Sequence, residues 1–509
     1  MKNRVIPHPR GKVLGGSSAL NFMTWDRAVK KEYESWLEVG NPGWGWDVFS
    51  NAMRRSENFT SANSEWYGDE GIGRAGPISG TVNRYIPAWH DAWIPTLNRL
   101  GIPTNREYMD GNSLGVLYSS SSVEPTHYNR SYSANSYLPL AGKNLVVASN
   151  ATVAKVELKQ TGNKQRVTGV KLLNGTFIAA RREVILSAGS FGSPILLELS
   201  GIGQKSILEK AGIDQTIDLP GVGENLQDHI RISNVYQLKD NLTGIDRLNY
   251  DPGYAAEQLQ RWIDGEFSQY DYTGSAYSFQ TWRQAIGNDS QLLALAQDAV
   301  SNSHFVSETK KLEWLSDQTV PQLEIIMSDG YLGVKGYPPK NTALYGKNFF
   351  ALIAAVMHPL AHGNVHINTS SPLSKPIIDP RYLNNEHDIR AAIEGIKKCR
   401  QIALTPPLRD IWVSEYEPGF ESVKTDAEWR DYVLNATLSI YHPVGTCSML
   451  PKSKGGVVDS NLKVYGTTNL RVADVSIVPV LISGHTQTAA YGIGEMAADI
   501  IVGDAGRYS

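Results

Sequence analysis

The chain has 509 residues, of which 41% are hydrophobic and 19% are charged, and its formal net charge is −3. A chain of this size can bury a large core and predicts roughly two closely packed domains. The near-zero charge and the lack of a run rich in lysine and arginine argue against nucleic acid or a membrane as partner. A small molecule fits this composition better.

The location in the cell stays open. The longest apolar run, residues 349–357, is too short to cross a bilayer, and no signal peptide pattern opens the chain, so we expect a soluble protein. Asn-x-Ser/Thr sequons would suit a secreted glycoprotein, although such triplets also arise by chance. Secreted and intracellular locations therefore both remain, and nothing marks the oligomeric state. The sequons start at Asn58, Asn129, Asn150, Asn174, Asn241, Asn288, Asn368 and Asn435.

Hydrophobic periodicity predicts helices and strands in alternation. Two helices are expected between Glu32 and Glu57, separated by the turn-forming segment GNPGWGW, and a third over Tyr85–Leu100. A helix is also expected after the glycine turn that begins at Gly189, and another from about Glu386 to Leu404. The strand-like segments are Asn144–Lys159, Arg166–Gly175, Arg182–Ser190 and Asn469–Ser483.

One glycine pattern, Gly71-Ile-Gly-Arg-Ala-Gly76, matches the GxGxxG dinucleotide-binding fingerprint as a string. The fingerprint needs a buried strand before it and a helix after it. Here polar residues precede the glycines, and Pro77 follows them directly. We therefore interpret this string as a loop.

His358, His362 and His366 recur at intervals of four and resemble metal ligands on a helix. Pro359 and Gly363 interrupt the stretch, which then alternates like a strand, so the three rings should not share a face. We predict no metal site.

Two further histidines, His442 and His485, lie in loops near the end of the chain, each beside glycine and small polar residues. Such a histidine is more often structural than catalytic. The sequence around them points further, because five stretches resemble the glucose-methanol-choline (GMC) family of FAD-dependent oxidoreductases, in that family's order. These stretches are GKVLGGSSALN (11–21), SAGSFGSPILLELSGIG (187–203), PGVGENLQDH (220–229), HPVGTCSM (442–449) and LRVADVSIVP (470–479).

The resemblance implies a mixed α/β fold in which an FAD-binding, Rossmann-like domain joins a substrate domain built on an antiparallel sheet. The FAD-binding part would comprise residues 1–60, 130–229 and 440–509, and the substrate domain residues 61–129 and 230–439. Family members place a strand, a GxGxxG turn and a helix ahead of the motif at Gly11. This chain starts just before that motif, so we expect a truncated FAD-binding domain that lacks the usual pyrophosphate anchor.

The resemblance also assigns residues to FAD. The stretch from Gly15 to Thr24 would lie beside the isoalloxazine ring, Val153 would touch adenine through its backbone, and Asp474 would lie near the ribityl or phosphate portion. The complete set is Gly15, Gly16, Ser17, Asn21, Phe22, Met23, Thr24, Val153, Ala473, Asp474, Thr486 and Gln487.

In the same comparison His442 is the base that takes a hydroxyl proton from the alcohol, and His485 donates a hydrogen bond to the developing alkoxide. FAD would accept the hydride. Aromatic residues are dense between Tyr236 and Trp282, where the family's substrate domain lies, which suggests an aromatic or apolar alcohol. Ordinary packing in the core or in loops is the commoner explanation for any one of these rings.

Three hypotheses follow from intact flavin-side motifs and a missing ADP-side motif. The protein is an FAD-dependent alcohol oxidase or dehydrogenase whose sequence starts late. Alternatively, a shortened fold uses His442 and His485 as acid and base in a lyase, isomerase or cyclisation reaction. The third hypothesis is an inactive binding protein.

Overall fold

The computed structural model describes residues 4–60, 66–274, 276–303 and 305–505. Its elements surround two large hydrophobic cores. One core lies against an antiparallel sheet, and we call this part the sheet half. The other surrounds two parallel strands and the C-terminal helix, and we call it the parallel-strand half. The predicted mixed α/β fold with an antiparallel sheet is confirmed.

The sheet half is built on seven strands, all paired antiparallel. Strand β15 is buried along its whole length, which explains its uninterrupted apolar sequence FFALIAAV, because both of its faces are covered. Helix α12 (Glu386–Ala403) packs on this strand and has the predicted bounds within a residue. In spatial order the strands are β18 (Trp412–Glu417), β12 (Ile230–Leu238), β15 (Phe349–Val356), β14 (Leu323–Asp329), β13 (Ala276–Gln280) and β4 (Gly115–Tyr118), with β19 (Leu438–Ser439) also paired to β12.

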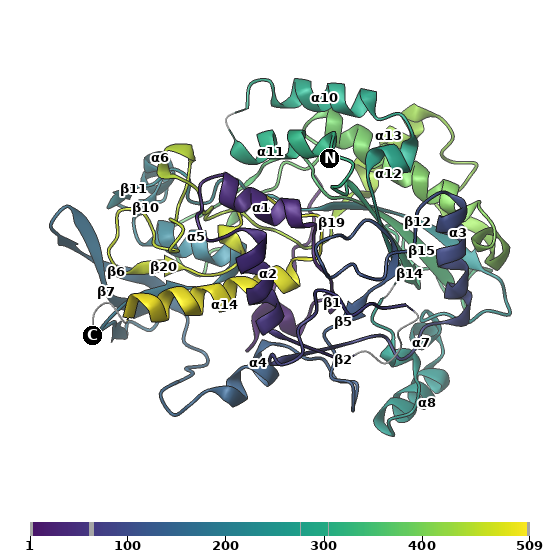
Figure 1. Ribbon diagram of the computed structural model, residues 1–509, viewed down its shortest axis with the longest axis horizontal. Coiled ribbons are helices and arrows are strands. Elements are labelled where there is room, and N and C mark those ends of the chain that lie inside the picture. Colours follow the sequence, from purple (N-terminus) through teal and green to yellow (C-terminus); the bar gives the residue numbers. More distant parts are fainter. Residues whose placement is uncertain (1–3, 61–65, 275, 304, 506–509) are drawn as a thin grey trace.

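The parallel-strand half holds β9 (Val184–Leu186) and β20 (Leu470–Val472), which pair in parallel. The chain passes from β9 through a glycine turn into helix α5 (Gly189–Leu199), as predicted. Helix α14 (Thr486–Ala505) packs against α2 (Trp46–Arg55), which crosses it in Figure 1. A three-stranded antiparallel sheet completes this half, with strands β6 (Val153–Thr161), β7 (Lys164–Leu172) and β8 (Phe177–Ala179).

Residues of the first quarter of the chain form a smaller, four-stranded sheet. Its order is β1 (Thr24–Trp25), β5 (Ser120–Ser121), β3 (Ile78–Thr81) and β2 (Glu57–Thr60). The string Gly71–Gly76 runs between β2 and β3 and no helix follows it, so its interpretation as a loop is confirmed. Two of its glycine amides, at Gly73 and Gly76, donate to Glu57.

Three predicted elements were too long. The segment Asn144–Lys159 becomes a strand only from Val153, and Val146 is 85% exposed because no strand among the described residues pairs with it. The helix predicted over Tyr85–Leu100 is a short 3-10 turn followed by α3 (Trp93–Arg99). Of Asn469–Ser483 only β20 is a strand, since the Asp474 side chain caps the 3-10 turn that follows it.

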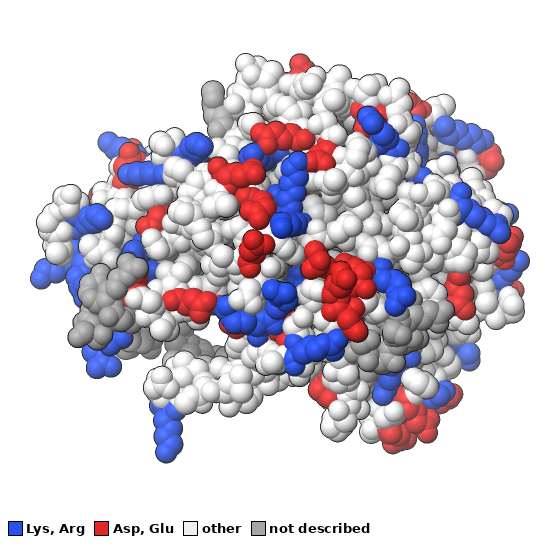
Figure 2. All heavy atoms as spheres, viewed as in Figure 1, with Lys and Arg blue, Asp and Glu red and all other residues white. Residues whose placement is uncertain are grey.

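Charged side chains of both signs are interspersed over the face shown in Figure 2, with wide uncharged areas between them. That face presents no continuous basic surface to a polyanion. No helix within the described residues combines the length and apolar character needed to cross a bilayer.

Candidate active site

The structure brings His442 and His485 together where the two halves meet. Their ring centroids are 5.1 Å apart, and the rings are nearly perpendicular. His442 follows β19 in a loop, while His485 directly precedes α14. The two residues are 43 positions apart in the sequence, so their contact depends on the tertiary fold.

A buried carboxylate fixes the loop of His442. The backbone amide of His442 donates to Asp228 Oδ1 at 2.8 Å, and the Ser439 hydroxyl donates to Asp228 Oδ2 at 2.5 Å. The Tyr382 hydroxyl donates to the same oxygen. Burial raises the pKa of Asp228 to about 6, although these hydrogen bonds oppose the shift. The loop also contains Tyr441 at a φ of 71°, an unusual conformation that these anchors hold.

The His442 ring meets a third imidazole. Its Nδ1 lies 2.9 Å from Nδ1 of His229, the residue after Asp228. No hydrogen bond from a described residue reaches Nε2 of His442, and the residue is only partly buried. Burial, followed by the positive charge of His485, lowers the pKa of His442 well below the usual value. His442 is therefore a neutral imidazole with one nitrogen available.

The His485 ring has carboxylates on both sides. Its backbone amide donates to Asp26 Oδ1 at 3.0 Å, and its Nδ1 lies 2.7 Å from Asp26 Oδ2. Its Nε2 lies 3.8 Å from Glu324 Oε1. Burial alone would lower the pKa of His485, but the charges of Asp26 and Glu324 outweigh burial and raise it to about 9. His485 is therefore an imidazolium at neutral pH.

Glu324 reaches this site from β14 of the sheet half and is 1% exposed. Its Oε1 has no hydrogen-bond partner among the described residues, and burial raises its pKa to about 7. One potential ligand atom from each of Asp26, Glu324 and His485 lies within 4.8 Å of the others, a spacing that would allow metal binding. However, Asp26 lies at Nδ1 of His485 and Glu324 lies at Nε2, on the other side of the ring. A single ring nitrogen therefore cannot bind a metal together with both carboxylates. The absence of a metal stays a prediction.

Of the aromatic residues between Tyr236 and Trp282, Tyr277 packs against the His485 ring, with centroids 5.3 Å apart. Its hydroxyl hydrogen-bonds with Thr24 Oγ1 at 2.8 Å. Tyr236 instead stacks on Phe350 in the core of the sheet half, and Phe267 is 62% exposed. The core-packing interpretation therefore describes Tyr236, whereas Tyr277 lies against the His485 ring.

The residues assigned to the isoalloxazine ring form one connected segment beside the two histidines. Asn21 Nδ2 donates to Gln487 Oε1 at 2.7 Å, which ties this segment to the start of α14. Gly15 has a φ of 90°, and a Cβ there would meet the Tyr132 ring at 2.7 Å. Met23 also has a positive φ, of 63°, and Phe22 is 71% exposed. A backbone held open by glycine beside the polar Ser17 and Asn21 fits the ring end of a flavin.

The residues assigned to the other end of FAD lie elsewhere in the parallel-strand half. Asp474, after Ala473, accepts from the Gly189 amide at 2.9 Å and from the Ser193 hydroxyl at 2.5 Å. The N-terminus of α5 is therefore already occupied by a carboxylate, and a phosphate would compete with it. Val153 begins β6, and Thr486 begins α14. The described residues fit the ring end of FAD better than its ADP end.

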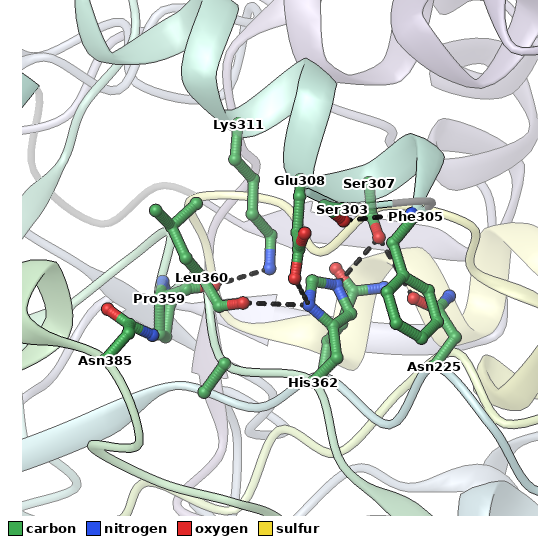
Figure 3. Close-up of polar contacts among 12 residues, drawn as sticks. Asn225, Ser303, Phe305, Ser307, Glu308, Lys311, Pro359, Leu360, His362 and Asn385 are labelled. Atoms are coloured by element: carbon green, nitrogen blue, oxygen red, sulfur yellow. Dashed lines mark hydrogen bonds and ion pairs between the residues drawn. The ribbon is translucent and has the colours of Figure 1, made fainter. Parts of the chain in front are cut away.

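The three histidines spaced by four do not converge, since each has a glutamate partner from a different element. His358 pairs with Glu32 at 2.6 Å and His366 with Glu198 at 2.7 Å. His362 pairs with Glu308 at 2.9 Å, and its Nε2 lies 2.7 Å from the Ser307 hydroxyl (Figure 3). In that buried cluster the Lys311 ammonium donates to the Pro359 carbonyl at 2.7 Å. These groups link α11 (Val306–Leu315) to the segment after β15.

Four residues of the site were missed in the sequence. Asp228 and His229 stand inside the family motif PGVGENLQDH, so the motif itself could have pointed to them. Asp26 lies five positions after Asn21, close to the flavin-side segment. Glu324 gave no signal, because a single acid in an apolar strand carries no pattern.

Comparison with known proteins identifies the family of the chain. Two family models, both described as GMC oxidoreductase, match residues 1–231 and 359–494. GMC oxidoreductase family protein Mala s 12 of Malassezia sympodialis is 33% identical, over 99% of this chain and 81% of that protein. A solved FAD-dependent oxidoreductase from Chaetomium thermophilum has a TM-score of 0.88 at 27% identity, covering 99% of this chain and 88% of that one. A fungal aryl-alcohol oxidase has a TM-score of 0.82 at 27% identity, covering 97% and 86%.

These matches define an FAD-dependent oxidoreductase. The chain belongs to the GMC oxidoreductase family, and the predicted family, enzyme class and cofactor are confirmed. An oxidase or dehydrogenase acting on a CH–OH group is the supported activity, which favours a redox enzyme over a non-redox enzyme or an inactive binding protein.

Proposed function

We propose that this protein oxidises the CH–OH group of a small aromatic or apolar alcohol, with His442 as the base. The observation that supports this role most directly is the free Nε2 of a neutral His442 beside the cationic His485. A neutral imidazole can take the hydroxyl proton, and a neighbouring imidazolium stabilises the negative charge that develops on oxygen. The aromatic preference is supported by Tyr277 and by the aryl-alcohol oxidase among the solved neighbours.

The residues divide the reaction as follows. The hydroxyl O–H bond breaks, and its proton forms an N–H bond at Nε2 of His442. His485 donates a hydrogen bond from Nε2 to the same oxygen while Asp26 keeps its Nδ1 proton. Bound FAD supplies the acceptor for the hydride from the carbinol carbon, which no side chain can provide. Gly15, Gly16, Ser17, Asn21 and Gln487 would hold its ring.

A direct test adds FAD to the purified protein and follows the flavin absorbance without oxygen during addition of benzyl alcohol, hexan-1-ol or glycerol. Bleaching by benzyl alcohol or hexan-1-ol, with the matching aldehyde as product, is the expected result. If dithionite bleaches the bound flavin but none of these alcohols does, the proposed substrate class is wrong.

A further inference from the structure

Two buried carboxylates hold the loop of His485, one at each end. Asp26 accepts from the His485 amide at 3.0 Å. Two positions earlier, the Ser483 amide donates to Glu32 Oε1 at 2.8 Å, and the Ser483 hydroxyl donates to Glu32 Oε2 at 2.6 Å. Glu32 therefore anchors the loop through its backbone and a side chain, without contacting the His485 ring.

Glu32 is joined to the sheet half through one histidine. His358 Nε2 lies 2.6 Å from Glu32 Oε1, and His358 Nδ1 lies 3.0 Å from Gln322 Oε1. All three side chains are buried. Gln322 directly precedes β14, the strand that carries Glu324. The chain of contacts thus returns to the active site, because Glu324 Oε1 lies 3.8 Å from Nε2 of His485.

Hydrogen-bond geometry determines the protons of this link. The NH₂ group of Gln322 donates to the carbonyls of Trp314 and Val320, at 3.0 and 3.4 Å, so its oxygen is the atom that faces His358. Nδ1 of His358 must then donate. Another proton must lie between Nε2 and Glu32 Oε1, since two lone pairs 2.6 Å apart would repel each other. The Glu32–His358 pair is therefore neutral overall, and it joins the loop to β14 without adding net charge.

The link has a consequence for His485. At 3.8 Å, Glu324 is too far from Nε2 of His485 to accept a hydrogen bond, yet its charge still acts on the ring. The Nε2 proton is left for the substrate oxygen. We propose that Glu32 and His358 are positioning residues that hold His485 at this distance from Glu324. The use of the Nε2 proton in the reaction rests on the function proposed above.

The test is a double-mutant cycle on the FAD-loaded protein with benzyl alcohol as substrate. His358→Leu breaks the link, so the charge of Glu324 should act less on His485. At pH 8.5 we expect kcat/KM to fall about 3- to 10-fold, as in Glu324→Gln, mainly through kcat. In the Glu324→Gln background the same substitution should cost less than about twofold. At pH 6 its effect should be small, because the pKa of Glu324 is about 7.

The matched control is His366→Leu. His366 also pairs with a buried glutamate, Glu198, at 2.7 Å, but no hydrogen bond among the described residues joins that pair to the loop of His485. Its effect should be the same with and without Glu324→Gln. Equal effects of His358→Leu in both backgrounds would overturn the proposal, because the link would then act independently of Glu324.

A measurement without turnover separates this proposal from the proposed function. Histidine-selective ¹⁵N NMR of the FAD-loaded protein gives the pKa of His485, whose signals are identified by their loss in His485→Gln. That pKa should fall in His358→Leu towards its value in Glu324→Gln, and stay unchanged in the control variant. An unchanged pKa in His358→Leu would overturn the proposal. A lowered pKa in a protein that oxidises no alcohol would support the positioning role and remove the proposed function.

If His358→Leu does not fold, Gln322→Leu breaks the next contact of the link, at Nδ1 of His358. The same fall in the pKa of His485 and the same dependence on Glu324 are then expected, and their absence would overturn the proposal.

Discussion

The loops that carry His442 and His485 share one anchoring device and differ in what meets the ring. In each loop a buried aspartate accepts the histidine's backbone amide, Asp228 in one and Asp26 in the other. Asp26 goes on to accept from the ring of His485, whereas the ring of His442 meets His229.

This difference separates the protonation states of two adjacent imidazoles. The pKa of His485 rises to about 9 and that of His442 falls well below its usual value. Burial acts in the same direction on both, so the carboxylates beside His485 make the difference. Groups whose surroundings push their pKa values apart can divide acid and base roles between them.

Replacing His442, the neutral imidazole of the pair, should have the largest effect on the reaction. In His442→Ala we expect the rate of flavin reduction by benzyl alcohol to fall about 10³-fold, because general-base assistance is lost. Stopped-flow absorbance without oxygen measures this step directly. FAD content and the melting temperature should match the wild type, which serves as the control. A loss below about fivefold would remove His442 from the role of base.

Replacing Asp26, the carboxylate beside the cationic His485, should have the next largest effect. In Asp26→Asn we expect kcat/KM at pH 8 to fall about 10- to 100-fold, because His485 loses a charge that stabilises its imidazolium. The measurement is kcat/KM for benzyl alcohol from pH 6 to 10.

The pH dependence has a definite sign. Asp26, Glu324, Tyr277 and His442 surround the His485 ring. The active, charged form of His485 exists below its pKa, so wild-type activity should persist to about pH 9 and decline above it. In Asp26→Asn the decline should begin at lower pH. An alkaline limb at the same pH in both proteins would contradict the assigned role of Asp26.

The sequence predicted the two rings and not the groups that distinguish them. His442 and His485 stand in motifs that resemble a family, so their functional roles could be proposed from short stretches. The opposite pKa shifts depend on Asp26 and Glu324, which lie 459 and 161 positions before His485 in the sequence. No local pattern encodes that contact, because it arises only when the halves pack together.

The fold shows the same limit at the level of elements. Helix α12 was predicted well since its apolar face repeats with helical periodicity over many residues. The segment Asn144–Lys159 has strand-forming residues throughout, yet a strand also needs hydrogen-bond partners along its edge. Its first residues have no neighbouring strand among those described, and Val146 is 85% exposed there.

Glu324→Gln tests the carboxylate at the other nitrogen of His485, Nε2. Since the pKa of Glu324 is about 7, its side chain is largely neutral at pH 6 and largely charged at pH 8.5. The variant should therefore match the wild type at pH 6 and be about 3- to 10-fold slower at pH 8.5. The measurement is the ratio of the kcat/KM of the wild type to that of the variant as a function of pH. A ratio independent of pH would show that the charge of Glu324 does not act on the reaction.

Asp228→Asn should have the smallest effect on chemistry, because Asp228 anchors the backbone of His442 without contacting its ring. An asparagine oxygen can still accept from that amide, while its NH₂ group meets the Ser439 and Tyr382 hydroxyls, which can rotate to accept. We expect kcat to fall only a few-fold and the free energy of unfolding to fall by about 1 to 3 kcal/mol. Thermal and urea unfolding measure the second change.

The matched contrast is with Asp26→Asn, which replaces the equivalent anchor in the other loop. Both substitutions keep an acceptor for a histidine amide, and only Asp26→Asn removes a carboxylate that contacts a histidine ring. The alkaline limb of kcat/KM should therefore move in Asp26→Asn and stay in place in Asp228→Asn. If both variants moved it equally, the protonation state of His485 would depend on loop geometry instead of on the carboxylate at its ring.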